Sequence, residues 1–297
     1  MPHLLNALVN GQDLSNWERE WIEYLLGDFH VEFHYDPEHV LLLPNPILVL
    51  SVAWPGQSAA LIKHLQACQS QGYKPGVIHT SDEWEQCPLD FYDHAAFVFR
   101  NYFRASLANR PDCHYFANGY RAGITANLQP RPISQRKYRW SFAGSLKNSR
   151  YAMMNAAMQI PGGAYFITRT FNDPQALPPG EYAQMLNASV FVPCARGHLS
   201  LDTFRLYEAL EAGCIPIVED PAHNDQTMTL LRPQESYWFN AYGPAFPCPR
   251  IASWENLAKV MAAVDIEAAA AKIGKWWSDY KTALRAQFTR TIMPTLQ

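Results

Sequence analysis

One segment in the C-terminal half of the chain combines an arginine, a carboxylate and the start of a helix. Residues 200–220 read SLDTFRLYEALEAGCIPIVED, a charged helix followed by an apolar strand. Arg205 and Glu208 are three residues apart, so both project from nearly the same face of that helix. An arginine can bind phosphate through two parallel hydrogen bonds, and a carboxylate can accept hydrogen bonds from the two hydroxyls of a ribose. The pair therefore indicates a site for a nucleoside diphosphate.

The predicted helix also offers its N-terminus to an anion. It begins near Thr203, and Ser200 or Asp202 could cap it. The first N–H groups of a helix have no intrahelical partner, and the positive end of the helix dipole favours phosphate there. We therefore expect Ser200 and Thr203 to lie beside the ligand.

Two residues before the helix separate this interpretation from a simpler one. Taken alone, Arg205 and Glu208 could be a surface ion pair, worth about 0.3–0.5 kcal/mol. Arg196 and His198 lie in the preceding loop and favour a ligand site. Both are further candidates for contacts to the same ligand.

Two acids in the N-terminal half are candidates for a general base. Asp82 and Glu83 directly follow a predicted strand in HTSDEWE, and we favour Asp82 as the base, then Glu83, with His79 third. Asp82 could equally cap a short helix, with Glu85 at the capping-box position. The sequence leaves both interpretations open.

A metal site is not expected. The chain contains no Asp-x-Asp pair, and adjacent acids such as Asp82 and Glu83 point in different directions on an extended segment. We therefore predict no metal ion and no other cofactor.

The elements that position these residues alternate between strands and helices. Apolar runs such as ILVLSV at 47–52 fit strands covered on both faces, and helical spacing follows them. This alternation predicts parallel sheets with helical crossovers. The Pro-rich, basic segment 128–137 is the candidate linker between two such units. The aromatic segment 236–243 could shape a ligand pocket or fill a core.

The segment FVPCARGHLSLDTFRLYEALEAGCIPIVED resembles the signature block of exostosin-like glycosyltransferases. Upstream, RWSFAGSLKNSRYAMM is similar to the Phe-x-Gly strand and the arginine-bearing segment of that family. The resemblance is clear across 138–220 and fainter across 75–122. It implies a GT-B fold and inverting transfer of a sugar from a nucleoside diphosphate, usually UDP.

Carried over residue by residue, the resemblance implies that Arg205 contacts the diphosphate and Glu208 the ribose. Gly144, Ser145 and Arg150 would line the phosphate side of the pocket. The chain lacks the N-terminal membrane anchor of eukaryotic Golgi members and is short, which favours a bacterial-type enzyme.

The expected fold is therefore α/β, with two Rossmann-like, doubly wound domains facing a central cleft. The boundaries are 1–130 for an acceptor-side domain, 136–265 for a domain that binds the nucleotide sugar, and 266–297 for a C-terminal helix that crosses back to the first domain. Ligands of open α/β sheets bind beyond the carboxyl ends of the strands, where the candidate residues lie.

Composition limits the partners. The chain has 297 residues, of which 48% are hydrophobic and 17% charged, as in globular proteins. With 24 Lys and Arg against 27 Asp and Glu, the net charge of −3 gives no support for a nucleic-acid partner. No signal peptide and no apolar run of about 20 residues is visible. We expect a cytoplasmic protein whose membrane contacts, if any, are peripheral.

Together with these observations, the resemblance implies an inverting, metal-independent hexosyl- or pentosyltransferase. It would move a sugar from a nucleoside diphosphate, preferably UDP, to a hydroxyl of a glycan acceptor in bacterial surface polysaccharide synthesis. Two alternatives stay open: a fucosyl-type transferase that uses a GDP-sugar, and a non-catalytic two-domain protein that binds a nucleotide or sugar.

Overall fold

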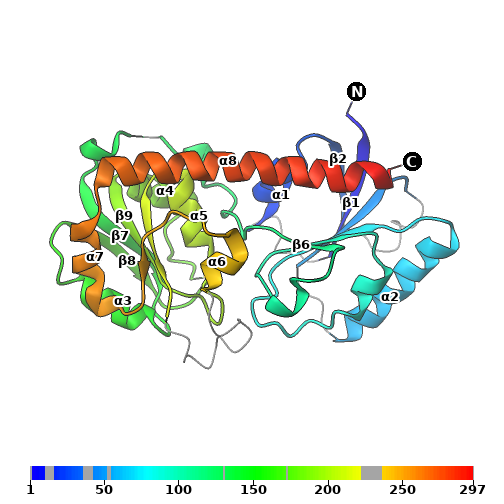
Figure 1. Cartoon of the computed structure of the whole chain (residues 1–297), viewed down its shortest axis with the longest axis horizontal. Helices are drawn as coiled ribbons and strands as arrows, with labels where there is room; N and C mark the ends of the chain where they lie inside the picture. The colour runs from blue at the N-terminus through cyan, green and yellow to red at the C-terminus, as the bar shows by residue number, and fades with distance from the viewer. Residues whose placement is uncertain are drawn as a thin grey trace. The chain divides into compact units, whose positions relative to one another are not determined.

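The computed structural model describes residues 2–10, 17–35, 43–51, 55–129, 131–171, 173–221 and 236–296. The chain divides into two compact units, each with its own sheet (Figure 1). One unit comprises Met1–Asn118 and Lys281–Gln297, and the other comprises Gly119–Tyr280. The division falls before Gly119, ahead of the segment 128–137 that the sequence suggested as a linker.

The first unit contains a six-stranded parallel sheet in the order β2-β1-β3-β4-β5-β6. The central strands are buried along their whole length or nearly so, as expected for a parallel sheet covered on both faces. Phe288 lies in the last part of a long C-terminal helix and stacks on Phe99, with ring centroids 3.7 Å apart. The end of that helix therefore belongs to this core. The elements are β1 (Leu4–Asn10), α1 (Arg19–Leu25), β2 (His30–His34), β3 (Pro46–Leu50), α2 (Pro55–Ser70), β4 (Gly76–His79), β5 (Val98–Arg100) and β6 (Cys113–Tyr115).

The second unit contains a five-stranded parallel sheet in the order β11-β10-β9-β7-β8. The chain passes from β7 to β8 in one direction, and then returns past β7 to β9 and continues outward. Because parallel crossovers are right-handed, this reversal places α3 on one face of the sheet and α4 and α5 on the other. The elements are β7 (Tyr138–Ser145), α3 (Arg150–Ala157), β8 (Gly163–Thr168), α4 (Pro179–Asn187), β9 (Ser189–Cys194), α5 (Phe204–Glu211), β10 (Ile215–Glu219), α6 (Tyr237–Tyr242), β11 (Arg250–Ile251), α7 (Leu257–Ala263) and α8 (Ile266–Ile292), which contributes to both units.

The aromatic segment 236–243 fills a core. Trp238 is fully buried and stacks on Phe246, with ring centroids 5.0 Å apart. Tyr242 contacts Trp276 and Tyr280 edge-to-face. These rings pack α6 against α8 within the second unit, so the structure favours the core interpretation of this segment.

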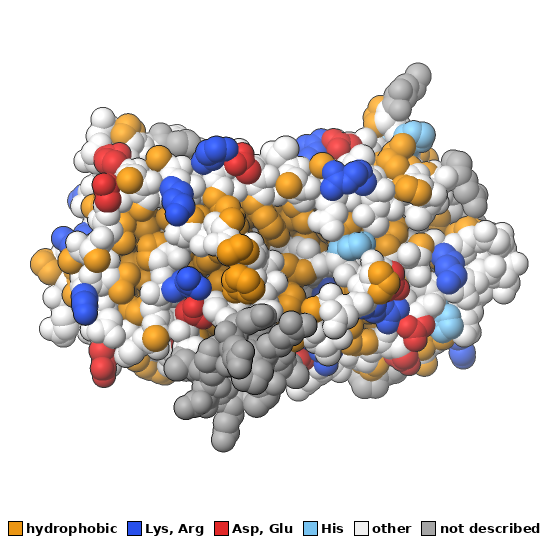
Figure 2. Space-filling view, viewed as in Figure 1, with side chains coloured by type: hydrophobic (Ala, Val, Ile, Leu, Met, Phe, Trp, Pro, Cys, Tyr) orange, Lys and Arg blue, Asp and Glu red, His pale blue; other side chains and the backbone are white. Residues whose placement is uncertain are grey.

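The described surface shows mixed charges. On the face drawn in Figure 2, basic and acidic side chains are interspersed, consistent with the net charge of −3. None of the described helices is long and apolar enough to cross a bilayer.

Candidate functional site

The second sheet has a topological switch point between β7 and β9. The loop after β7 leads to α3 on one face, and the loop after β9 leads toward α5 on the other. Loops that diverge in this way leave a crevice at the carboxyl ends of the two strands, where open α/β sheets bind ligands. Gly144 and Ser145 end β7, and Arg196 follows β9 by two residues. The structure therefore brings these predicted donor residues to one edge of the sheet.

Arg205 reaches from the first turn of α5 to the end of β7. Its Nη2 donates to the carbonyl of Ala143 at 2.7 Å, and its guanidinium carbon lies 4.4 Å from the centroid of the Phe142 ring. Gly144 adjoins this contact with φ +137, and a β-carbon there would lie 2.7 Å from Nη2 of Arg205. The backbone angle at this position favours glycine, and any side chain there would force the guanidinium of Arg205 to shift.

Two buried polar atoms at the start of α5 have no hydrogen-bond partner among the described residues. They are Oγ1 of Thr203 and Nε of Arg205. Both residues are only 8% exposed. A buried polar group without a partner costs about 1–3 kcal/mol, so such groups usually meet a ligand or an ordered water. Both atoms lie at a helix N-terminus, which favours an anion.

The expectation that Ser200 or Asp202 caps α5 was wrong. The N-cap residue is Thr203, and its side chain makes no capping hydrogen bond. Ser200 Oγ accepts from the backbone N–H of Asp202 at 3.0 Å. The buried carboxylate of Asp202 accepts hydrogen bonds from the hydroxyls of Tyr207 and Tyr237. Ser200 and Asp202 thus shape the loop before the helix.

Glu208 lies next to Arg205 and is 5% exposed, so the two residues are not a surface ion pair. Its carboxylate accepts hydrogen bonds from the hydroxyl of Tyr182 on α4 and from the backbone N–H of Arg121. Burial raises the pKa of Glu208, and the charge of Arg205 and these hydrogen bonds oppose the shift. Glu208, Arg205, Tyr182 and Arg121 thus form a polar cluster at the carboxyl end of the sheet. No pattern in the sequence pointed to Tyr182 or Arg121.

Arg150 holds the two crevice loops together. It is the first residue of α3 and is 6% exposed. Its Nε donates to the carbonyl of Arg196 at 3.0 Å, and its Nη1 donates to the carbonyl of Ser145 at 3.1 Å. These two bonds make Arg150 a brace between the loops.

Asn148 and Glu219 add further links between the same loops. Asn148 has φ +49, and its amide donates to the carbonyls of Gly197 and His198. Glu219 ends β10 and accepts hydrogen bonds from Ser149 and from Arg196. The sequence signal for Glu219 was an acid at the end of an otherwise apolar strand.

In the first unit, Asp82 is buried and fully engaged. Its Oδ2 accepts from Nη2 of Arg100 at 2.8 Å, and its Oδ1 accepts from the backbone N–H groups of Gln86 and Cys87. Burial alone would raise the pKa of Asp82, but the charge and hydrogen bond of Arg100 hold it below its usual value. Asp82 therefore stabilises the turn after β4, and Glu83 is the more exposed of the two acids.

One cluster in this unit has the composition of a metal site. Ligand atoms of His79, Asp82 and Cys87 lie within 4.8 Å of one another. However, Nη1 of Arg100 lies 3.3 Å from Nδ1 of His79, so a guanidinium already supplies the positive charge. Burial lowers the pKa of His79 to about 3, and the charge of Arg100 contributes. The arrangement therefore fits a buried ion pair of Asp82 with Arg100 better than a binding site for a metal cation.

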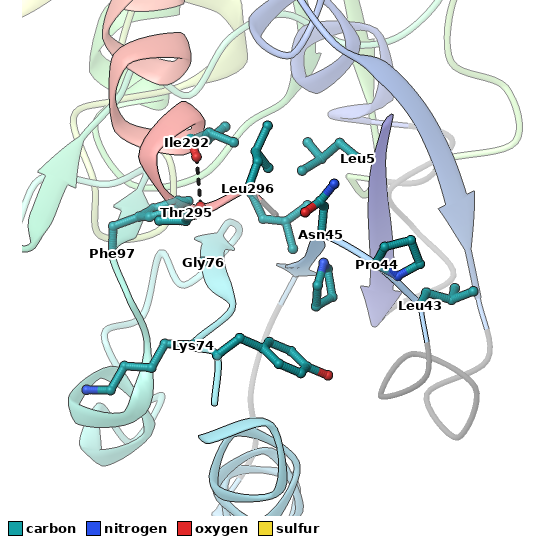
Figure 3. A pocket seen from close by; sticks show the side chains of 13 residues that line it. Leu5, Leu43, Pro44, Asn45, Lys74, Gly76, Phe97, Ile292, Thr295 and Leu296 are labelled. Atoms are coloured by element: carbon teal, nitrogen blue, oxygen red, sulfur yellow. Dashed lines mark hydrogen bonds between the residues drawn. The ribbon is translucent and has the colours of Figure 1, made fainter. Parts of the chain in front are cut away.

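A hollow in the first unit lies away from the expected crevice edges (Figure 3). Leu5, Pro46 and Gly76 line it at the starts of β1, β3 and β4, and Ile292 and Leu296 close it from the C-terminal segment. Because ligands of such sheets bind at the carboxyl ends of the strands, this hollow is not the candidate site.

Comparison with solved structures bears on the fold. A crystal structure of an α1,3-fucosyltransferase matches with a TM-score of 0.52 and 11% identity, over 100% of this chain and 91% of the other. An α-glucosyltransferase in complex with UDP-glucose and DNA containing an abasic site matches with a TM-score of 0.45 and 11% identity, over 99% and 94%. The predicted GT-B fold, with two parallel sheets and flanking helices, is confirmed.

The family follows from the sequence. The sequence model of the RXYLT1 C-terminal domain matches residues 124–296, more than half of the chain. The chain belongs to this family, and the resemblance to exostosin-like glycosyltransferases is confirmed. No curated protein matches the chain. Family and fold together place the protein among the glycosyltransferases.

Proposed function

We propose that the protein transfers a sugar from a nucleoside diphosphate, preferably UDP, to a hydroxyl of a glycan acceptor, with inversion and without a metal ion. The observation that carries this proposal is the pair of buried, unpartnered atoms at the start of α5, Thr203 Oγ1 and Arg205 Nε, as far as the described residues extend. A diphosphate supplies both the acceptor oxygens and the negative charge that this helix end favours.

The neighbouring residues are proposed to contact different parts of the nucleotide. Glu208 is the proposed ribose contact, because a carboxylate has more acceptor sites than its bonds from Tyr182 and Arg121 occupy. Gly144 and Ser145 allow a close approach to the backbone at the end of β7. His198 and Ser200 are proposed as further contacts from the loop after β9.

The same residues serve the chemical step. Transfer leaves negative charge on the departing diphosphate, which must be stabilised as it develops. Arg205 and the N-terminus of α5 supply positive charge there, a role that a metal ion has in other enzymes. Arg196 adds a second guanidinium to the loop before α5.

The acceptor hydroxyl must lose a proton, which requires a base. We assign this role to the pair Asp82 and Glu83, and within the pair to Glu83. Asp82 is buried, has three hydrogen bonds and has a lowered pKa, so it is a weak base. Glu83 is adjacent and partly exposed.

A thermal-shift panel with UDP, GDP, CMP and ADP tests the donor. A nucleotide at about 100 times its Kd adds about 2.7 kcal/mol of stability. For a protein of this size, each kcal/mol raises the melting temperature by roughly 2–4 °C. We expect a shift with UDP that Glu208→Ala removes. The control is Glu181→Ala, which alters an exposed acid beside Tyr182.

Other outcomes decide between the alternatives. A shift with GDP alone would replace the UDP-sugar by a GDP-sugar. Nucleotide binding without turnover on any glycan acceptor would favour a non-catalytic binding protein. If no nucleotide shifts the melting temperature, the proposed donor site is wrong.

A further inference from the structure

Glu219 connects the two loops that border the switch-point crevice. Its Oε2 accepts from the hydroxyl of Ser149, the N-cap of α3, and from the backbone N–H of Arg196 at 3.0 Å. Its Oε1 accepts from Nε of Arg196 at 3.3 Å. The Glu219 side chain is 6% exposed. One carboxylate thus binds the loop after β7 and the loop after β9, although it belongs to β10.

The two bonds to Arg196 fix the direction of its guanidinium. Glu219 binds both the backbone N–H and Nε of Arg196, which closes a ring through that side chain. A guanidinium is planar, so fixing Nε fixes the plane in which its remaining donors point. The carbonyl of Arg196 is held in turn by Arg150.

Electrostatics alone gives Glu219 no role near a diphosphate. A carboxylate repels phosphate, so its presence beside the crevice should weaken donor binding. A buried acid at such a place is useful only if it orients a group that attracts the phosphate more strongly. Arg196 is that group, because Glu219 is bonded to it at two atoms.

We infer that Glu219 is a positioning residue for the donor diphosphate: it locks the loops after β7 and β9 together and aims Arg196 at the phosphates. This inference rests on the proposed function, because it concerns the same nucleotide site. It adds Glu219 and Ser149 to the residues on which donor affinity depends.

The sign of one affinity change tests the inference. In Glu219→Gln a negative charge is removed, so Coulomb repulsion alone predicts tighter binding of a diphosphate. Positioning predicts weaker binding, by about tenfold or 1.4 kcal/mol. Isothermal titration of the full chain with UDP, or with GDP if the wild type binds that instead, measures the change. The matching nucleoside, which lacks phosphates, should bind within about twofold of wild type.

Two further variants complete the experiment. Asp220→Asn is the matched control, because Asp220 is the next acid and pairs with the exposed Arg250 at 3.6 Å. It should leave diphosphate affinity unchanged or slightly higher. Ser149→Ala removes one of the bonds without changing charge, and should weaken diphosphate binding by about threefold with the nucleoside unaffected. It keeps the inference testable if Glu219→Gln does not fold.

Each contrary result has one meaning. If Glu219→Gln binds the diphosphate as tightly as wild type or more tightly, repulsion dominates and the inference fails while the proposed function stands. Equal losses for nucleoside and diphosphate would show a general role in folding and also overturn it. A wild type that binds no nucleoside diphosphate would overturn both the inference and the proposed function.

Discussion

A β-carbon on residue 144 would lie 2.7 Å from Nη2 of Arg205, so Gly144 and Arg205 are in direct contact at the end of β7. The terminal nitrogen of an arginine can move, whereas the strand cannot. A side chain at position 144 would therefore displace Arg205 from the carbonyl of Ala143.

We predict that Gly144→Ala lowers the affinity for the nucleoside diphosphate by about tenfold or more, measured by titration calorimetry. The positive φ of Gly144 adds strain of about 1–3 kcal/mol, which lowers the melting temperature. Gly243→Ala is the control, because Gly243 also has positive φ, at +74, but a β-carbon added there would meet no atom of the described residues within 4 Å. It should lose stability and keep nucleotide affinity. Equal affinities in the two variants would contradict the role given to Gly144.

The second prediction concerns the buried pair of Asp82 and Arg100, whose side chains are each 3% exposed. Asp82→Asn leaves the guanidinium buried without its counter-charge, which should cost about 3–5 kcal/mol at pH 7 in urea unfolding. Asp112→Asn breaks the more exposed pair of Asp112 with Arg110, whose side chains are 34% and 26% exposed, and should cost at most about 1 kcal/mol. A small effect of Asp82→Asn would show that Asp82 is not structural.

The pH dependence of the stability difference between wild type and Asp82→Asn follows from the direction in which the pKa of Asp82 is shifted. The folded pKa of Asp82 lies below the usual value of 3.8, so the folded state releases the proton more readily than the unfolded state. The stabilisation by the pair is fully present above pH 3.8 and is lost as pH falls through the lower folded pKa. The difference in unfolding free energy between wild type and Asp82→Asn should therefore decrease only as the pH falls below 3.8.

The third prediction separates the two adjacent acids. If Glu83 is the base, Glu83→Gln should lower kcat by about 10²–10⁴-fold and leave nucleotide affinity unchanged. Glu32→Gln is the control, since Glu32 lies on β2 of the same unit with a side chain 54% exposed. A near-normal kcat in Glu83→Gln would remove Glu83 from the mechanism.

Sequence reasoning predicted the parts of the fold that depend on local pattern. The alternation of apolar strands and helices predicted two parallel sheets, and both are present. Arg205 and Glu208 could be predicted to share one face of the helix, because residues three apart in a helix project in nearly the same direction. Gly213, with φ +65, follows α5 and precedes β10, as expected for a glycine that ends a helix.

Contacts between distant segments could not be predicted in this way. Asp82 and Arg100 are 18 residues apart and meet only because β4 and β5 are neighbours in the sheet. Glu219 reaches Ser149 across 70 residues for the same kind of reason. The capping error at Asp202 arose because its carboxylate binds Tyr207, on α5 itself, and Tyr237, which is 35 residues away in the sequence.

The last prediction concerns the source of positive charge at the diphosphate. If Arg205 and the N-terminus of α5 provide it, a chelator should leave the transfer rate within about twofold, and added Mg²⁺ or Mn²⁺ should not tighten nucleotide binding. Arg205→Lys keeps the charge but loses the planar set of donors, so nucleotide affinity should fall by about tenfold. Neither ion should restore it. A rate that collapses with chelator and recovers with Mg²⁺ or Mn²⁺ would show that a metal ion, and not the arginine alone, neutralises the leaving group.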